Sequence, residues 1–102
     1  MNLNKIKQKL KKFSNERNWD GYHNPKNLSM ALSVEASELV EIFQWLTIEE
    51  SKSLNDKQIQ ATKEELADIL IYLIRIADKL DINLEKAVEQ KIKLNAKKYP
   101  LK

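Results

Sequence analysis

The stretch that decides the fold is VEASELVEIFQW at residues 34–45. With a rotation of about 100° per residue, one stripe of a helix collects Leu28, Leu32, Leu39, Ile42 and Leu46. Glu35 lies in the middle of this apolar stripe, and Glu38 lies about 60° to one side of it. A buried, unpaired carboxylate costs several kcal/mol or takes up a proton. The pattern therefore predicts a cation or a hydrogen-bond donor opposite Glu35.

The composition indicates one all-α domain. The chain has 102 residues, of which 42% are hydrophobic and 32% charged, with one Gly and two Pro. Leu, Ile, Lys, Glu and Ala predominate, and these residues propagate helices at low cost. The chain contains no Cys, no signal-peptide pattern and no long apolar run. We therefore expect a cytoplasmic protein without disulfides, membrane spans or thiolate catalysis.

The positive charge is concentrated at the ends of the chain. The formal net charge is +3, and ten of the sixteen lysines lie in the first twelve and last twelve residues. Lysines at these ends could attract phosphate. Binding of nucleic acid by the first lysine-rich segment is an alternative, but no aromatic or arginine accompanies these lysines there. A solvent-facing helix surface is the simpler interpretation.

Apolar periodicity and capping residues predict four long helices. The first is capped by Asn2 or Asn4 and runs to about residue 18, and the others cover residues 25–46, 57–80 and 84–98. Asn24, Asp56 and Asn83 are the expected caps of the last three, and Thr47 with Glu50 predicts a short extra turn. In the third helix, Ile71 and Ile74 point away from its acidic residues. A second apolar patch on so short a chain predicts a subunit interface and a homo-oligomer.

Residues 19–25 interrupt this periodicity with a loop that holds two aromatics and the only Gly and His of the chain. Because Asn24 and Pro25 start the next helix, the loop delivers Trp19 and His23 to its first turn. Two interpretations remain open. The rings either line a binding pocket, or they cover a helix end while His23 adds a hydrogen bond.

The third helix carries a second pair of acids, Glu65 and Asp68, with Tyr72 on the same face. One His and no Cys exclude catalytic triads, zinc fingers and thiol chemistry, and no glycine-rich phosphate loop is present. Two acid pairs on neighbouring helices predict an all-oxygen site for Mg²⁺, with Mn²⁺ as a possible substitute. On the last helix, Lys91 and Lys98 either complement these carboxylates and bind phosphates, or belong to a frayed final turn.

With these residues in place, the sequence resembles the MazG-type all-α nucleoside triphosphate pyrophosphohydrolases, and within them the dCTP pyrophosphatase branch. The similar segments, written with x for any residue, are WxxYHxPxNL from residue 19, ELxExFQW from residue 38, EELxDILIYL from residue 64 and KxxxNxxKYP from residue 91. They span nearly the whole chain and occur in the family's order. One departure is lysine near the C-terminus, where relatives often have arginine.

The resemblance implies a single domain over residues 1–102 with a four-helix MazG-like fold, assembled as a dimer or tetramer. It implies hydrolysis of a (deoxy)nucleoside triphosphate, dCTP or a related pyrimidine, to the monophosphate and pyrophosphate. The implied metal ligands are Glu35, Glu38, Glu65 and Asp68, and the implied catalytic residues that orient the water are Glu38 and Glu41. The implied base and sugar residues are Trp19, His23, Trp45 and Tyr72. The implied phosphate residues are Lys91, Asn95 and Lys98.

An alternative of another class is a non-enzymatic helical interaction module whose paired acids bind lysines of a partner. Metal dependence separates the two, because the enzyme requires Mg²⁺ and the module does not. The sequence leaves open which base is preferred, whether ribose is accepted, how many ions bind, and which cellular task the hydrolysis serves.

Overall fold

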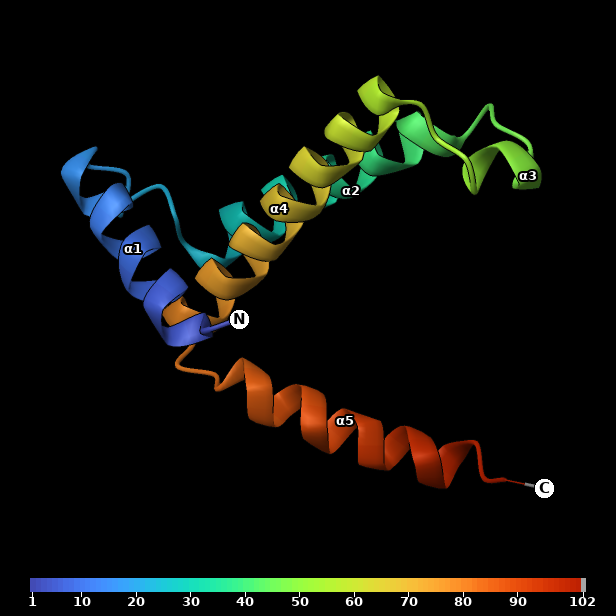
Figure 1. The fold of residues 1–102 in the computed structure, drawn as a ribbon. Helices are drawn as coiled ribbons and strands as arrows, with labels where there is room; N and C mark the ends of the chain where they lie inside the picture. Colours follow the sequence, from blue (N-terminus) through green and yellow to red (C-terminus); the bar gives the residue numbers. More distant parts are fainter. Residues whose placement is uncertain (102) are drawn as a thin grey trace.

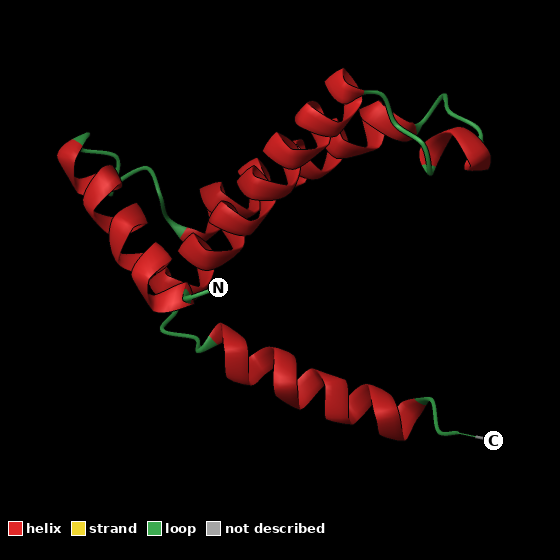
Figure 2. Cartoon of the chain, viewed as in Figure 1, coloured by secondary structure: helices red, strands yellow, loops and turns green. Residues whose placement is uncertain are grey.

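A computed structural model of the protein describes residues 1–101 and contains five helices and no strand within them (Figures 1 and 2). They are α1 (Leu3–Glu16), α2 (Pro25–Phe43), α3 (Ile48–Ser51), α4 (Asp56–Lys79) and α5 (Leu84–Lys98). The predicted all-α class and the order of the helices are confirmed. None of these helices, within residues 1–101, is long and apolar enough to cross a membrane.

Asparagine side chains fix the start of each long helix. Asn2, Asn24, Asn55 and Asn83 each accept a hydrogen bond from the backbone N–H three residues further on. The cap predicted at Asp56 is wrong: Asp56 is the first residue of α4, and Asn55 caps the helix because Gln58 completes a capping box with it. The capping box predicted for Thr47 and Glu50 is confirmed, and it starts α3.

The helix α2 ends three residues earlier than predicted. The N–H of Leu46 donates to the carbonyl of Phe43 at 2.9 Å, which closes a turn over residues 44–46 instead of another helical turn. This turn directs the chain into α3, and it leaves the side chain of Trp45 86% exposed.

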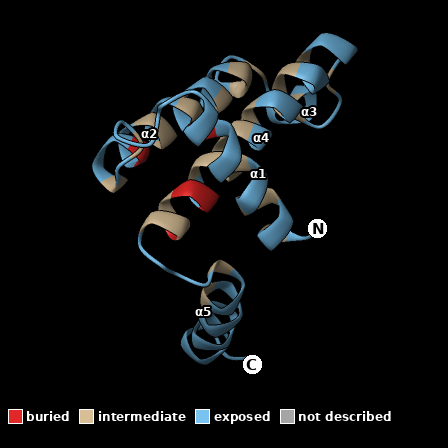
Figure 3. Ribbon diagram, turned by 90° about the vertical axis from the view of Figure 1, so that its left-hand side faces the viewer, coloured by how far each residue is buried: buried red, intermediate tan, exposed pale blue. Residues whose placement is uncertain are grey.

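The helices α2 and α4 pack side by side, and α1 lies across the C-terminal half of α4 (Figure 1). Where the three helices meet, Leu28 is 1% exposed and Ile74 is 3% exposed (Figure 3). The prediction that Ile74 belongs to a free subunit interface is therefore wrong. Leu3 of α1 and Ile74 line the same pocket between α1 and α4, so α1 covers this face of α4 within the same chain.

The helix α5 leads away from the other helices instead of completing a four-helix bundle within one chain (Figures 1 and 3). In its second half, α5 carries the polar residues Lys91, Asn95 and Lys98, and all three are exposed. The apolar side chains of Val88 and Ile92 are exposed as well, at 50% and 63%. Beyond its first turn, where Leu84 and Ala87 are half-buried, α5 therefore contributes to no core within one chain.

The single chain is less compact than a typical domain of its size. Its radius of gyration is 16.6 Å, whereas a compact domain of this length has about 13 Å. Its accessible surface is 8365 Å², against roughly 6000 Å² for a folded monomer of 12.0 kDa. The chain therefore exposes much apolar surface that a self-sufficient monomer would bury.

One apolar surface on α4 has a regular pattern, which we call the heptad stripe. Its residues are spaced by seven and are 38–53% exposed: Ile59, Leu66, Leu73 and Leu80. A seven-residue apolar repeat along a helix is the pattern with which helices pack against other helices. No element within residues 1–101 covers this stripe.

Candidate metal centre

Three carboxylates meet where α2 packs against α4. Each of Glu35, Glu38 and Glu65 contributes an oxygen, and these oxygens all lie within 4.8 Å of one another. We call these three residues the carboxylate cluster. Glu35 and Glu65 are half-buried and Glu38 is exposed, so the cluster is open to solvent on one side. The predicted meeting of the two acid pairs is present for three of their four members.

The cluster has the electrostatics of crowded acids. The pKa of the Glu65 carboxyl is raised to about 7, first by hydrogen bonding to Glu35, then by burial and by Glu38. The pKa of Glu35 is also raised. The hydrogen bond with Glu65 by itself lowers this pKa, but burial together with the carboxylates of Glu38 and Asp68 outweighs that effect. Crowding of the carboxylates therefore favours the protonated form of Glu65 up to about pH 7.

The donor set fits a hard divalent cation. One oxygen of Glu35 and one of Glu65 are buried and lack a hydrogen-bond partner, so each has a free lone pair beside the other carboxylates. Carboxylate oxygens are the ligands that Mg²⁺ and Mn²⁺ prefer in proteins. Asp68 lies one turn along α4 and is close enough for its charge to raise the pKa of Glu35, so it can act as a fourth ligand.

Metal-free protein should lose stability as the pH rises from 5 to 8. The folded state holds the Glu65 proton up to about pH 7, whereas a glutamate carboxyl in water has a pKa near 4.5 and releases its proton there. The contribution of the Glu65 proton to the free energy of unfolding is therefore complete below pH 4.5, and it is lost as the pH rises through 7. The pKa of His23 is lowered by burial and then by Arg75 and Lys79, so His23 acts in the opposite direction.

We expect Glu65→Gln to flatten the pH dependence of the melting temperature measured in EDTA, because the variant has no proton to lose at this position. Glu64→Gln is the matched control, since Glu64 is exposed on the same turn of α4 and lies outside the cluster. An equal pH slope in wild type and Glu65→Gln would contradict the assignment of Glu65.

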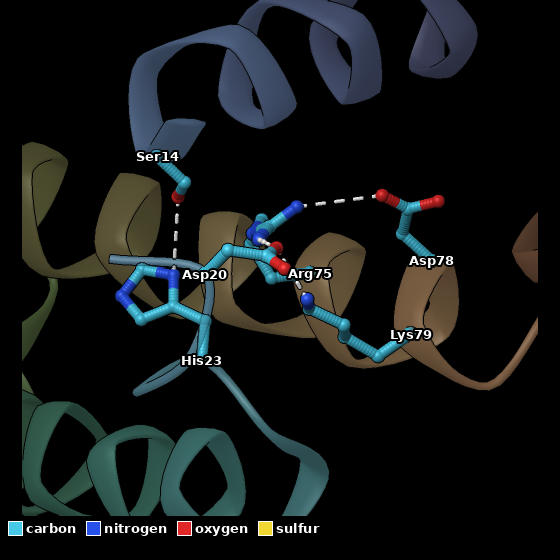
Figure 4. A network of polar contacts seen from close by, with 6 residues as sticks. All are labelled: Ser14, Asp20, His23, Arg75, Asp78 and Lys79. Carbon is cyan, nitrogen blue, oxygen red and sulfur yellow. Dashed lines mark hydrogen bonds and ion pairs between the residues drawn. The ribbon is translucent and has the colours of Figure 1, made fainter. Parts of the chain in front are cut away.

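The loop of residues 17–24, called here the Trp19 loop, lies against both α1 and α4 (Figure 4). The ring of Trp19 packs edge-on against Phe13 with centroids 5.5 Å apart, and the ring of His23 lies 5.7 Å from Trp19. Ser14 Oγ is hydrogen-bonded to His23 Nδ1 at 3.2 Å. The structure thus brings Trp19 and His23 together, as the sequence indicated, and the hydrogen bond expected for His23 is present.

Tyr72 lies between the carboxylate cluster and the Trp19 loop. Along α4 it follows Asp68 by one turn and precedes Arg75, which contacts the loop, by less than one turn. Burial raises the pKa of its hydroxyl, and so do the charges of Glu35 and Asp68, which places Tyr72 beside the cluster. Along α4, the carboxylate cluster is therefore followed by Tyr72 and then by the contact with the loop that carries Trp19 and His23.

Other predicted residues are not brought to this place within one chain. Trp45 follows the last turn of α2, whereas His23 precedes its first turn, and at 1.5 Å per residue the ends of α2 are roughly 29 Å apart. Glu41 is exposed one turn beyond Glu38 and lies outside the cluster. Lys91, Asn95 and Lys98 lie on α5, apart from α2 and α4 (Figure 1).

Sequence reasoning missed Arg75, although a signal was present. Arg75 is one of two arginines in the chain, and it stands in an otherwise apolar part of α4, seven residues after Asp68. Its side chain is 2% exposed, and its guanidinium approaches Asp78 and Asp20 (Figure 4). A charged residue inside an apolar run is itself an indication of a partner.

Comparison with known proteins assigns the family. The model of the MazG-like family matches residues 30–102, so the chain belongs to this all-α family, as the sequence motifs indicated. The chain is 38% identical to dCTP pyrophosphatase 1 of Rattus norvegicus over 97% of its own length, and 39% identical to that of Bos taurus over 97%. The resemblance to the dCTP pyrophosphatase branch is thereby confirmed.

The chain spans about three-fifths of the length of these curated relatives, 59% and 60%. A solved structure, the crystal structure of a pyrophosphatase from Archaeoglobus fulgidus, superimposes with a TM-score of 0.87 and 40% sequence identity. That match covers 92% of this chain and 88% of the other. The similarity to this structure therefore extends over nearly all of the fold described above.

Proposed function

We propose that this protein hydrolyses a deoxynucleoside triphosphate, dCTP or a close pyrimidine relative, to the monophosphate and pyrophosphate, with Mg²⁺ as cofactor. The observation that carries the proposal is the carboxylate cluster, in which buried oxygens of Glu35 and Glu65 lack partners. Relatives named for dCTP pyrophosphatase activity support the substrate class. In the interaction-module alternative, lysines of a partner would meet the same lone pairs, so metal dependence is what separates the two.

In this proposal, Glu35, Glu38, Glu65 and Asp68 hold Mg²⁺. When bound, the ion supplies charge that neutralises the triphosphate and lowers the pKa of a water molecule. Glu38, with Glu41 one turn away, orients the attacking water and accepts its proton. The water oxygen bonds to the α-phosphorus, the bond from that phosphorus to the bridging oxygen breaks, and pyrophosphate leaves.

We further propose that the base lies on the side of the cluster that leads to the Trp19 loop. Tyr72 is next to the acids, and the rings of Trp19 and His23 follow. About seven residues of α4 separate Asp68 from the loop contact at Arg75, which is roughly 10 Å at 1.5 Å per residue. This distance suits a nucleotide with its phosphates on the acids and its base on the rings.

The same proposal assigns a homo-oligomer, a dimer or a tetramer, whose partner copies complete the site. Within one chain, the phosphate residues of α5 lie apart from α2 and α4. Trp45 follows Glu38 of the cluster by seven residues, but α2 separates it from the Trp19 loop by roughly 29 Å. Trp45 is 86% exposed, and Lys91 and Lys98 carry the positive charge that four acids and a triphosphate require. In the assembly, we place these residues at the cluster of another copy.

A direct test is a panel of nucleoside triphosphates incubated with the protein and Mg²⁺, with pyrophosphate release as the readout. We expect dCTP to be cleaved fastest, and EDTA to stop the reaction completely. Equal cleavage of dATP and dGTP would overturn the base assignment. No release from any nucleotide would favour the interaction module.

We expect light scattering at micromolar concentration to give a mass of at least two chains. The heptad stripe is the surface we assign to this contact, so Leu66→Gln and Leu73→Gln together should shift the mass towards the monomer. Lys63→Gln, at an exposed position of the same helix, is the control and should leave the assembly intact. A wild-type protein that is monomeric under these conditions would reject the assembly.

A further inference from the structure

The Trp19 loop has little internal structure to hold it in place. Its backbone makes a short turn in which the N–H of His23 donates to the carbonyl of Trp19 at 3.0 Å, and the N–H of Trp19 donates to the carbonyl of Ser14 at 2.9 Å. Asn18 adopts a positive φ of 57° to enter this turn. At the end of the loop, Asn27 of α2 donates through Nδ2 to the carbonyl of Tyr22 at 3.1 Å, whereas the middle of the loop is held from α4.

The contact with α4 consists of charges. Asp20 Oδ1 accepts a hydrogen bond from Lys79 Nζ at 2.5 Å and lies 3.7 Å from Arg75 Nη2 (Figure 4). These two cations lower the pKa of Asp20, with Lys79 as the larger cause. Asp20 is therefore a charged side chain that links the middle of the Trp19 loop to the end of α4.

Arg75 is a charged residue that is buried and only partly paired. Its side chain is 2% exposed, its Nε and Nη2 atoms have no hydrogen-bond partner, and its contact with Asp78 on the same helix is 3.4 Å long. A buried and incompletely paired guanidinium costs free energy that an apolar residue would not cost. Asp78 contacts Nη1, and Nη2 is the nitrogen that approaches the loop, at 3.7 Å from Asp20 Oδ1.

We propose that Arg75, together with Lys79, is a positioning residue that holds Asp20 and thereby fixes Trp19 and His23 for the base of the substrate. The inference rests on the proposed function, because it assigns these rings to the base. The loop is then held from two sides. Phe13 and Ser14 of α1 contact the rings directly, and the cations of α4 hold the backbone between them through Asp20.

This role predicts an effect on substrate binding and not on the chemical step. Glu65 of the carboxylate cluster lies roughly 15 Å from Arg75 along α4, so we expect release of the loop to leave the cluster unchanged. A released loop must be ordered each time the substrate binds, and that cost weakens binding. The Michaelis constant should therefore rise while kcat stays the same.

The first test is Asp20→Asn, which keeps the size of the side chain and removes its charge. Asp20 is 60% exposed at its side chain, so this variant should fold as the wild type does. We expect KM for dCTP to rise about threefold to tenfold with kcat unchanged. In NMR spectra, hydrogen exchange at the indole N–H of Trp19 should become faster.

Asp78→Asn is the matched control. It removes the other carboxylate that contacts Arg75, without touching the loop. We expect KM and Trp19 exchange to stay at the wild-type values, since only the link to the loop matters. If Asp78→Asn had the same effect as Asp20→Asn, loss of any ion pair of Arg75 would be sufficient and the positioning role would be overturned.

Double substitutions identify the partners of Asp20. Arg75→Lys keeps a positive charge, so it should keep part of the hold on Asp20 and raise KM less than Asp20→Asn does. Adding Lys79→Gln to Asp20→Asn should raise KM little further, because both substitutions remove the same link. Additive increases in KM would overturn the link. The Trp19 exchange rate is independent of catalysis: if Asp20→Asn leaves it unchanged, this inference fails even when hydrolysis of dCTP by wild type supports the proposed function.

Discussion

Glu38→Gln should abolish turnover and leave the fold intact. Glu38 is the exposed member of the carboxylate cluster, so the substitution disturbs no packing. Under the proposed function, it removes a negative metal ligand and a proton acceptor for the attacking water. General base catalysis alone is typically worth about a hundredfold to ten-thousandfold, and we expect kcat to fall by at least that range. Asp68→Asn should have a similar effect on turnover.

Thermal unfolding separates loss of the site from loss of the fold. Mg²⁺ should raise the melting temperature of the wild type, because the ion binds only the folded state. The rise should be much smaller for Glu38→Gln, whose melting temperature in EDTA should equal or exceed that of wild type because three crowded acids become two. Glu64→Gln should behave as wild type in both measurements. Full activity of Glu38→Gln would remove Glu38 from the site.

Trp45→Ala should lower kcat/KM for dCTP by roughly tenfold to a hundredfold, since a stacked aromatic ring is worth about 1–3 kcal/mol per base. The 86% exposure of Trp45 means that its removal costs the single chain little packing. The rise in melting temperature with Mg²⁺ should be unchanged, because Trp45 is not a ligand. Normal cleavage of dCTP by this variant would exclude Trp45 from the base pocket.

Mixing the inactive Glu38→Gln with the impaired Trp45→Ala tests whether Trp45 acts on another copy. If Glu38→Gln and Trp45→Ala disrupt sites shared between chains, mixed oligomers contain some sites with both residues intact. We therefore expect partial recovery of activity after the two proteins are unfolded together and refolded. Mixing Glu38→Gln with Asp68→Asn is the control and should recover nothing, because both residues belong to the same chain's cluster. If neither mixture recovered activity, Trp45 would act at the carboxylate cluster of its own chain.

The local elements of the fold were predictable from the sequence because they depend on neighbouring residues. The caps at Asn24 and Asn83 and the capping box of Thr47 and Glu50 are short-range hydrogen bonds, and the structure has all three. The cover over Ile74 was not predictable in this way. A helical wheel shows that Ile74 points away from the acidic residues of the same helix. It cannot show whether α1 or another copy of the chain packs on Ile74.

The same distinction applies to the site. The periodicity placed Glu35 on the buried face of α2, and the three-residue spacing placed it beside Glu38, as observed. The positions of Trp45 and of Lys91 relative to the cluster depend on the turn after α2 and on the direction of α5. Both are tertiary features that spacing along one helix does not encode. Arg75 escaped notice because its partner Asp20 lies 55 positions earlier in the chain.

The central claim, attack of water on the α-phosphorus at the carboxylate cluster, is tested most directly by hydrolysis in ¹⁸O-labelled water. Wild-type protein, Mg²⁺ and dCTP are incubated in this solvent, and the two products are analysed by mass spectrometry. We predict one ¹⁸O atom in dCMP and none in pyrophosphate, with no product formed by Glu38→Gln. Label in pyrophosphate, or release of dCDP and inorganic phosphate, would contradict the claim.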